Sequence, residues 1–202
     1  MHNDPRPFKS RKKPLSETHN LIRVTQAADF AARRHSDQRR KGERAEPYFN
    51  HLAEVAHLLA QATDGADANL VMAGYLHDTI EDQDVSHGQL VAAFGLDVAD
   101  LVQFVTDDKS LPKARRKELQ VEHAPHLPMR AQMLKLADKC SNLGAILASP
   151  PPWPLARKVE YFDWAASVAA GCRGCNPFLE ARFADLQARR SELGEPAPSS
   201  SV

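Results

Sequence analysis

Histidine and carboxylate side chains interrupt otherwise apolar segments at two places in the sequence. His77 and Asp78 are adjacent in AGYLHDTIED, and Asp138 lies in MLKLADKCSN. An ionised carboxylate that is buried without a partner costs several kcal/mol, so a positive charge must neutralise Asp78 and Asp138. Another histidine, His51, opens a predicted helix further upstream. A divalent metal held by these two imidazoles and two carboxylates would supply the charge.

Two more carboxylates follow the His77-Asp78 pair at helical spacing. Glu81 lies four residues after His77 and Asp82 four residues after Asp78, so each pair shares one face of a continuous helix. With the metal held by the other residues, Glu81 and Asp82 are free to orient or deprotonate an attacking water. A lone histidine–aspartate pair in a helix is more often a hydrogen-bonded core pair, but the converging acidic groups favour the metal site.

The elements that must position these residues are helical. Apolar residues recur every three or four positions, and the alternation typical of strands is nearly absent. The sequence therefore predicts a single all-α domain of eight or nine helices, with one buried helix over 70–80 that carries the His77-Asp78 pair. The helices are predicted within 21–31, 52–62, 70–80, 86–94, 98–105, 112–123, 133–143, 155–170 and 178–188.

Composition narrows the class of protein. The 202 residues are 43% hydrophobic, and 26 Lys and Arg balance 26 Asp and Glu, which argues against nucleic acid or a membrane as the partner. No apolar run approaches the ~18 residues of a membrane span. The first twenty residues are polar and basic, without the apolar core of a secretory signal. Three cysteines cannot all pair within the chain, and Cys172 and Cys175 lack a second pair for a zinc site. We therefore expect a soluble cytoplasmic protein.

The two ends of the chain are poor in residues that build a core. Residues 1–18 are predicted to be a flexible basic arm, residues 19–190 the folded domain, and residues 191–202 a flexible tail. A solvated arm is favoured over a nucleic-acid-binding one. No feature of the sequence specifies an oligomeric state.

Several spaced motifs together resemble one known superfamily. The chain resembles the HD-domain metal-dependent phosphohydrolases, and more narrowly the hydrolase domain of RelA/SpoT proteins and the small stand-alone hydrolases of the metazoan SpoT homologue group. The similar stretch covers about residues 20–190 and implies a single HD-domain helical fold. The segments that carry it are QRRKGERAEPYFNH, AGYLHDTIEDQDVS, FGLDVADLVQFVTDDKSLPK, LKLADKCSN and RKVEYFDWA.

The resemblance assigns roles to individual residues. It implies one Mn²⁺ per chain, although the mixed nitrogen and oxygen donors would equally suit Fe²⁺, Co²⁺ or Zn²⁺. The implied metal ligands are His51, His77, Asp78 and Asp138, and Glu81 and Asp82 are implied to manage the attacking water. The substrate-binding residues that the resemblance implies are Arg40, Lys41, Lys109, Asn142, Arg157 and Tyr161. Tyr48 and Asn50 are added as substrate-binding residues because they lie beside the first ligand, His51.

The activity implied by the resemblance is removal of the 3′-pyrophosphate of guanosine 3′,5′-bis(diphosphate) (ppGpp) or pppGpp, which yields GDP or GTP and pyrophosphate. Three departures from the family pattern leave alternatives open: the longer loop at residues 43–45, Leu52 after His51, and the Leu143-Gly144 pair. One alternative is an HD phosphohydrolase of another nucleotide such as NADPH. The other is a regulatory HD module that binds nucleotide without turnover, which the Glu81-Asp82 pair argues against.

Overall fold

The computed structural model describes residues 15–194, so the predicted basic arm up to residue 14 and the tail from residue 195 lie outside the described residues. Nine of the ten α-helices in this range have at least eight residues, and α4 is a single turn. The only strand-like pairing within 15–194 is the isolated bridge between Arg39 and Pro47. The all-α prediction is confirmed. The helices are α1 (Leu15–Arg34), α2 (Phe49–Ala62), α3 (Ala68–Leu76), α4 (Thr79–Asp82), α5 (His87–Phe94), α6 (Leu96–Val105), α7 (Lys113–His123), α8 (Met129–Ala148), α9 (Leu155–Ala170) and α10 (Pro177–Ala188), with 3-10 helices η1 (Ala124–His126) and η2 (Arg189–Gly194).

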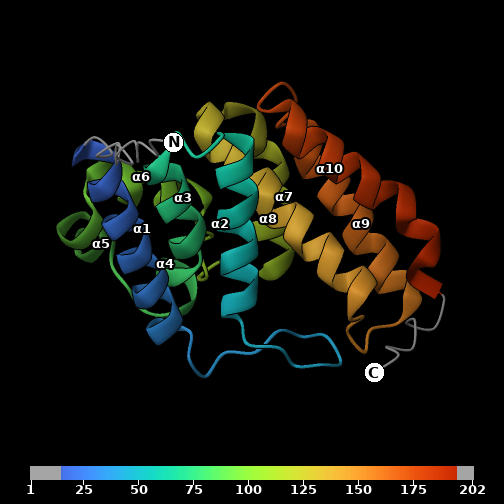
Figure 1. The fold of residues 1–202 in the computed structure, drawn as a ribbon. Helices are drawn as coiled ribbons and strands as arrows, with labels where there is room; N and C mark the ends of the chain where they lie inside the picture. Colours follow the sequence, from blue (N-terminus) through green and yellow to red (C-terminus); the bar gives the residue numbers. More distant parts are fainter. Residues whose placement is uncertain (1–14, 195–202) are drawn as a thin grey trace, which may run out of the picture.

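Helix α2 runs through the middle of the molecule, with α1 and α3 on one side and α8 to α10 on the other (Figure 1). It packs against both α3 and α8, and this arrangement buries an aliphatic core. A side chain at Gly74 would place its Cβ 2.8 Å from the Cα of Ala56, so the glycine permits the close approach of α3 to α2. The core residues in these three helices include Leu52, Leu59, Leu70, Met72, Leu134 and Leu136.

Helix boundaries follow local signals in the sequence. The Ser86 hydroxyl accepts a hydrogen bond from the backbone N–H of Gln89, whose side chain accepts one from the backbone N–H of Ser86, and together they form a capping box. Gly95 separates α5 from α6 with φ of 89°, a conformation that a β-carbon disfavours. Asn176 caps α10 in the same way that Asp67 caps α3.

The structure corrects the prediction of one helix over 70–80. Helix α3 ends at Leu76 and α4 begins at Thr79, with the His77-Asp78 pair in a turn between them. Asp78 leaves helical geometry with φ of −99° and ψ of 0°. Side chains take up carbonyl groups next to the break: the Thr79 hydroxyl donates to Leu76 O at 2.6 Å, and His77 Nδ1 lies 2.9 Å from Gly74 O. These local bonds stabilise the interruption.

The described helices extend four residues beyond each of the predicted domain limits, 19 and 190. Helix α1 begins at Leu15, and η2 extends the described fold to Gly194. The C-terminal extension is ordered because η2 packs on α8, α9 and α10 and leaves Leu193 only 7% exposed. No helix among the described residues is long and apolar enough to cross a membrane.

Candidate metal centre and adjoining cavities

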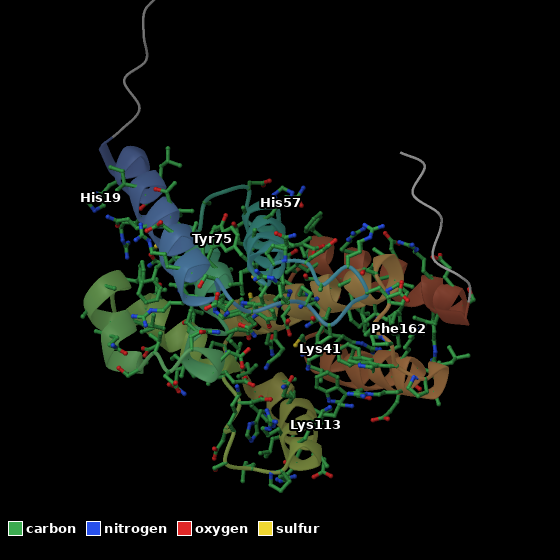
Figure 2. All side chains as sticks on the ribbon, turned by 90° about the horizontal axis from the view of Figure 1, so that it is seen from below. His19, Lys41, His57, Tyr75, Lys113 and Phe162 are labelled. Carbon is green, nitrogen blue, oxygen red and sulfur yellow. The ribbon has the colours of Figure 1, made fainter. Side chains whose placement is uncertain are left out.

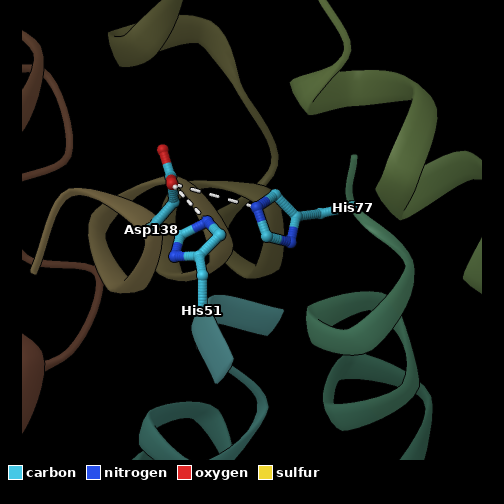
Figure 3. A group of neighbouring side chains, drawn as sticks. All are labelled: His51, His77 and Asp138. Atoms are coloured by element: carbon cyan, nitrogen blue, oxygen red, sulfur yellow. Dashed lines mark ion pairs between the residues drawn. The ribbon is translucent and has the colours of Figure 1, made fainter. Parts of the chain in front are cut away.

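Two imidazoles and a carboxylate, from α2, the turn after α3, and α8, lie next to one another (Figure 3). The donor atoms of His51, His77 and Asp138 all lie within 4.8 Å of one another. Asp138 Oδ1 is 3.3 Å from His51 Nε2 and 3.8 Å from His77 Nε2. The carboxylate of Asp78 borders the same group, with Oδ2 at 3.2 Å from His77 Nε2 and 3.7 Å from His51 Nε2. All four predicted ligands are therefore brought together.

Both imidazoles are oriented through the ring nitrogen that faces away from the group. His51 Nδ1 is 2.8 Å from the hydroxyl of Ser141, which in turn donates to Glu54 Oε2 at 2.6 Å. Because the hydroxyl proton goes to Glu54, the hydroxyl oxygen accepts from His51. His77 Nδ1 donates to Gly74 O. Each Nε2 lone pair is thus directed inward, the arrangement that metal-binding histidines adopt.

The charge balance of the group calls for a cation. His77 Nε2 is buried without a hydrogen-bond partner among the described residues. Burial alone would lower the pKa of His77, but the carboxylates of Asp78 and Asp138 outweigh it and raise the pKa to about 9. Burial with His77 and Arg40 nearby lowers the pKa of the His51 imidazole despite its hydrogen bond to Asp138. The nitrogen and oxygen donors fit a divalent transition metal, which would replace the proton on His77.

Neighbouring side chains hold the two carboxylates in place. The Tyr48 hydroxyl donates to Asp78 Oδ2 at 2.6 Å, and Asn142 Nδ2 donates to Asp138 Oδ1 at 2.6 Å. The buried ammonium of Lys139 lies 2.9 Å from Asp138 Oδ2. Burial opposes ionisation of Asp138, but the Lys139 charge and the His51 hydrogen bond hold its pKa well below the usual range. Asp138 therefore stays ionised although it is largely buried.

Glu81 and Asp82 extend beyond the donor group in different directions. Glu81 Oε2 accepts from the backbone N–H of Asp107 at 3.2 Å, and its other oxygen is 3.4 Å from Arg116 Nη1. Asp82 pairs with the ammonium of Lys109 and accepts from Gln38 Nε2 at 2.9 Å. The break before α4 separates these two carboxylates from the metal donors, so they do not stack on His77 and Asp78 along one helix.

Three adjoining cavities share wall residues, and one of them, the metal cleft, reaches the donor group. The metal cleft, about 160 Å³, is lined by His77, Asp78, Glu81 and Asp138. The central cavity, about 290 Å³, shares Tyr48 and Asn142 with it. The cationic cavity, about 590 Å³, shares Lys41, Trp153 and Tyr161 with the central one and is also lined by Lys113, Arg116, Lys117 and Arg157.

Six of the predicted substrate-binding residues line these cavities: Arg40, Lys41, Tyr48, Asn142, Arg157 and Tyr161. Arg40 donates to Asn142 Oδ1 at 3.0 Å and lies 5.7 Å from the centre of the Tyr48 ring. Arg157 stacks over the Trp153 ring at 4.3 Å.

Two predicted substrate contacts lie elsewhere. Asn50 is exposed and lines none of these cavities, because the start of α2 turns it toward solvent while His51 turns inward. Lys109 is likewise outside their walls, since its ammonium pairs with Asp82. Their role in substrate binding stays a prediction, and in this structure Lys109 holds the carboxylate of Asp82, a predicted catalytic residue.

Sequence reasoning missed several residues that line the cavities or support them. Lys113 and Lys117 lie in the basic run over 113–117, which by itself is typical of a solvated helix face, yet both line the cationic cavity. Figure 2 shows Lys41 and Lys113 on neighbouring segments of the same side of the molecule. Burial and the charges of Arg157, Lys41 and Lys117 lower the pKa of Lys113, as expected where cations converge. Trp153 also lines the cationic cavity. The sequence feature that could have identified it is an aromatic residue directly after three prolines.

Comparisons with known proteins agree with this architecture. The HD domain family matches residues 27–163. The chain is 43% identical over 164 residues to guanosine-3′,5′-bis(diphosphate) 3′-pyrophosphohydrolase MESH1 of Danio rerio, covering 81% of this chain and 91% of the relative. The Homo sapiens protein of the same name is 45% identical over 168 residues, which are 83% of this chain and 94% of the relative.

A solved structure described as a metazoan ortholog of SpoT that hydrolyses ppGpp superposes with a TM-score of 0.80 and 39% identity, covering 85% of this chain and 97% of that one. The Listeria monocytogenes protein lmo0812 gives a TM-score of 0.59 at 29% identity over 72% of this chain and 98% of that one. The resemblance inferred from the spaced motifs is confirmed, and this chain belongs to the HD-domain family.

Proposed function

We propose that this chain hydrolyses the 3′-pyrophosphate of ppGpp and pppGpp in a metal-dependent reaction. One water is consumed, the bond between the 3′-oxygen and phosphorus is cleaved, and GDP or GTP and pyrophosphate are released. The observation that carries the proposal is the buried His51, His77 and Asp138 group, whose metal cleft shares the wall residues Asp107 and Gln120 with the cationic cavity. The names of relatives more than 40% identical over nearly their whole length support the same reaction.

We propose that His51, His77, Asp78 and Asp138 hold the metal, and that the metal is Mn²⁺. Two imidazole nitrogens and two carboxylates suit this ion and other divalent transition metals. When bound, such a cation offsets negative charge on the diphosphate and lowers the pKa of water. The Ser141 hydroxyl and the Gly74 carbonyl keep the imidazoles in the required tautomers.

Glu81 and Asp82 are assigned to the attacking water. Burial and the nearby charge of Asp107 raise the pKa of Glu81, which makes it a better proton acceptor than an exposed glutamate. Its bonds to Asp107 N–H and Arg116 fix the carboxylate at the wall of the metal cleft. Asp82 is fixed by Lys109 and Gln38, so it can orient the same water without moving.

The remaining cavities are assigned to the nucleotide. Arg40 lines the central cavity, where its planar cation can stack on a purine base. Asn142, bonded to both Arg40 and Asp138, links the base region to the metal cleft. Lys41, Lys113 and Arg157 line the cationic cavity, where they would bind the phosphates that remain on the product.

The test is a product analysis of the purified chain with Mn²⁺. We expect ppGpp and pppGpp to yield pyrophosphate with GDP or GTP, and an Asp138→Asn variant to be inactive, which controls for contaminating phosphatases. NADPH belongs in the same panel because its turnover would release phosphate and favour the other nucleotide activity. Tight binding of ppGpp without turnover would favour a regulatory module and refute the proposed reaction.

The proposed partner is therefore a small nucleotide, and the proposed location is the cytoplasm. All three cysteines, Cys140, Cys172 and Cys175, are free and buried in the structure. Unpaired thiols are typical of proteins in a reducing compartment. Fractionation of the source cells with an antibody against the chain measures the location directly.

A further inference from the structure

The loop between α1 and α2 forms one wall of the central cavity and is firmly anchored. The backbone N–H of Arg40 donates to Glu46 O at 2.9 Å beside the bridge between Arg39 and Pro47. A side chain at Gly42 would place its Cβ 2.3 Å from Ser149 O, so the loop contacts the end of α8 directly. The backbone of this loop therefore has a fixed position at the wall of the cavity.

One side chain of this loop is an acid in surroundings that are otherwise cationic. Five charged side chains from the loop, Arg39, Arg40, Lys41, Arg44 and Glu46, line the central cavity, and Glu46 is the only acid among them. The Glu46 carboxylate is 43% exposed, and its nearest described ion pair is to Arg44 at 4.0 Å. Its oxygens are thus free to accept hydrogen bonds from a ligand.

The only other carboxylate on the described wall of this cavity belongs to Asp82. Both of its oxygens are engaged, one by Lys109 and the other by Gln38. A free carboxylate repels phosphate, so the Glu46 end of the cavity is unsuited to the charged end of a nucleotide. Ala145 and Ile146 of α8 contribute apolar surface to the wall of the same cavity. An acid beside an apolar wall suits a base that presents hydrogen-bond donors.

We infer that Glu46 selects guanine over adenine in the central cavity. Guanine presents two adjacent donors, N1–H and the N2 amino group, and an ionised carboxylate can accept both at once. Adenine presents an acceptor at N1, which a carboxylate repels. The inference rests on the proposed function, which places a guanine nucleotide here, and it adds the residue that distinguishes this base from others.

The test measures binding of GDP, IDP and ADP to wild type, Glu46→Gln and Glu43→Gln by calorimetry. Glu43 lies on the same loop but lines none of the described cavities, so it controls for the loss of one negative charge. We expect the wild type to bind GDP more tightly than IDP, which lacks the N2 amino group, and IDP more tightly than ADP. Glu46→Gln should weaken GDP binding about tenfold. This is the low end of the range for hydrogen bonds to a charged acceptor, and it applies because the Glu46 side chain is half exposed.

The same substitution should improve the relative binding of ADP. A glutamine amide offers one donor and one acceptor, the pattern that adenine complements, so the GDP-to-ADP ratio should fall more than tenfold. An unchanged ratio, an equal effect of Glu43→Gln, or no binding of GDP to wild type would overturn the inference. Turnover of ppGpp by the wild type is measured separately. If the wild type hydrolyses ppGpp but Glu46→Gln keeps the same base preference, only the role of Glu46 is refuted.

Discussion

Replacing Glu81 by glutamine separates the proposed chemistry from the architecture of the site. The amide is nearly the same shape as the carboxylate and can still accept from Asp107 N–H, the contact at 3.2 Å. The four proposed ligands are untouched, so metal content should stay near that of the wild type. Loss of a positioned acid or base costs roughly 10²–10⁴ in rate, which corresponds to about 3–5 kcal/mol of transition-state stabilisation. We expect kcat to fall at least a hundredfold, while the Kd for nucleotide changes little.

The same variant should be more stable than the wild type when no metal is present. Burial, followed by the charge of Asp107, raises the pKa of Glu81 in the folded chain. Ionised Glu81 therefore lowers the free energy of unfolding at neutral pH, and this penalty disappears as pH falls through the raised pKa toward the unfolded value of about 4.3. Glu81→Gln removes the penalty, so its melting temperature should exceed that of the wild type at pH 7 and match it in acid.

Three measurements check this reasoning: steady-state kinetics, metal content by elemental analysis, and thermal melting of the metal-free protein against pH. Glu118→Gln is the matched control, because Glu118 is an exposed acid on α7 whose one ion pair among residues 15–194 is with Arg115. Loss of metal from Glu81→Gln would identify the carboxylate as a ligand. A turnover loss below tenfold would remove it from the proton transfer, and a lower melting temperature at pH 7 would refute the burial argument.

Further predictions concern the groups that support the metal donors. Ser141→Ala removes the acceptor of the His51 Nδ1–H and should weaken Mn²⁺ affinity by roughly ten- to a hundredfold in a metal titration, with an unchanged circular dichroism spectrum. Tyr48→Phe deletes the hydrogen bond to Asp78 and should weaken Mn²⁺ affinity about tenfold in the same titration, since bonds to charged acceptors contribute roughly 1.5–3 kcal/mol. Chelation should lower the melting temperature, and Mn²⁺ at ~100 times its Kd should restore about 2.7 kcal/mol of stability by linkage. Equal melting temperatures with and without metal would contradict binding to the folded state.

Much of the fold follows from local sequence signals. Apolar periodicity predicts eight or nine helices, and the observed positions largely agree, except that the predicted helix over 70–80 ends at Leu76. Several of these helices pack against α2, α3 or α8, and α5 and α10 begin at the caps Ser86 and Asn176. The convergence of the metal donors is predictable for a different reason. Buried carboxylates in apolar helices need neutralisation, and a shared cation that also takes imidazole nitrogens as ligands is the simplest arrangement that satisfies all of these groups.

The cavities are less predictable because their walls come from distant parts of the chain. The Lys113 and Lys117 side chains look like an ordinary solvated helix face until α7 is placed beside α9, where Lys117 lies 3.1 Å from Glu160 and 5.0 Å from the centre of the Trp164 ring. Lys109 illustrates the same difficulty, because its position in the sequence predicts a substrate contact while its ammonium pairs with Asp82 in the structure. Long flexible side chains can reach many partners, so sequence spacing alone does not choose between them.

The break between α3 and α4 explains how residues 77–82 can serve two purposes. Successive residues of a continuous α-helix point about 100° apart, which would separate the side chains of His77 and Asp78. The turn instead brings His77 Nε2 and Asp78 Oδ2 within 3.2 Å, so neighbours in sequence can share one cation. The chain becomes helical again in α4, where Glu81 pairs with Arg116 and Asp82 pairs with Lys109. A substitution that restored helical geometry across the turn would therefore impair metal binding before it affected the core.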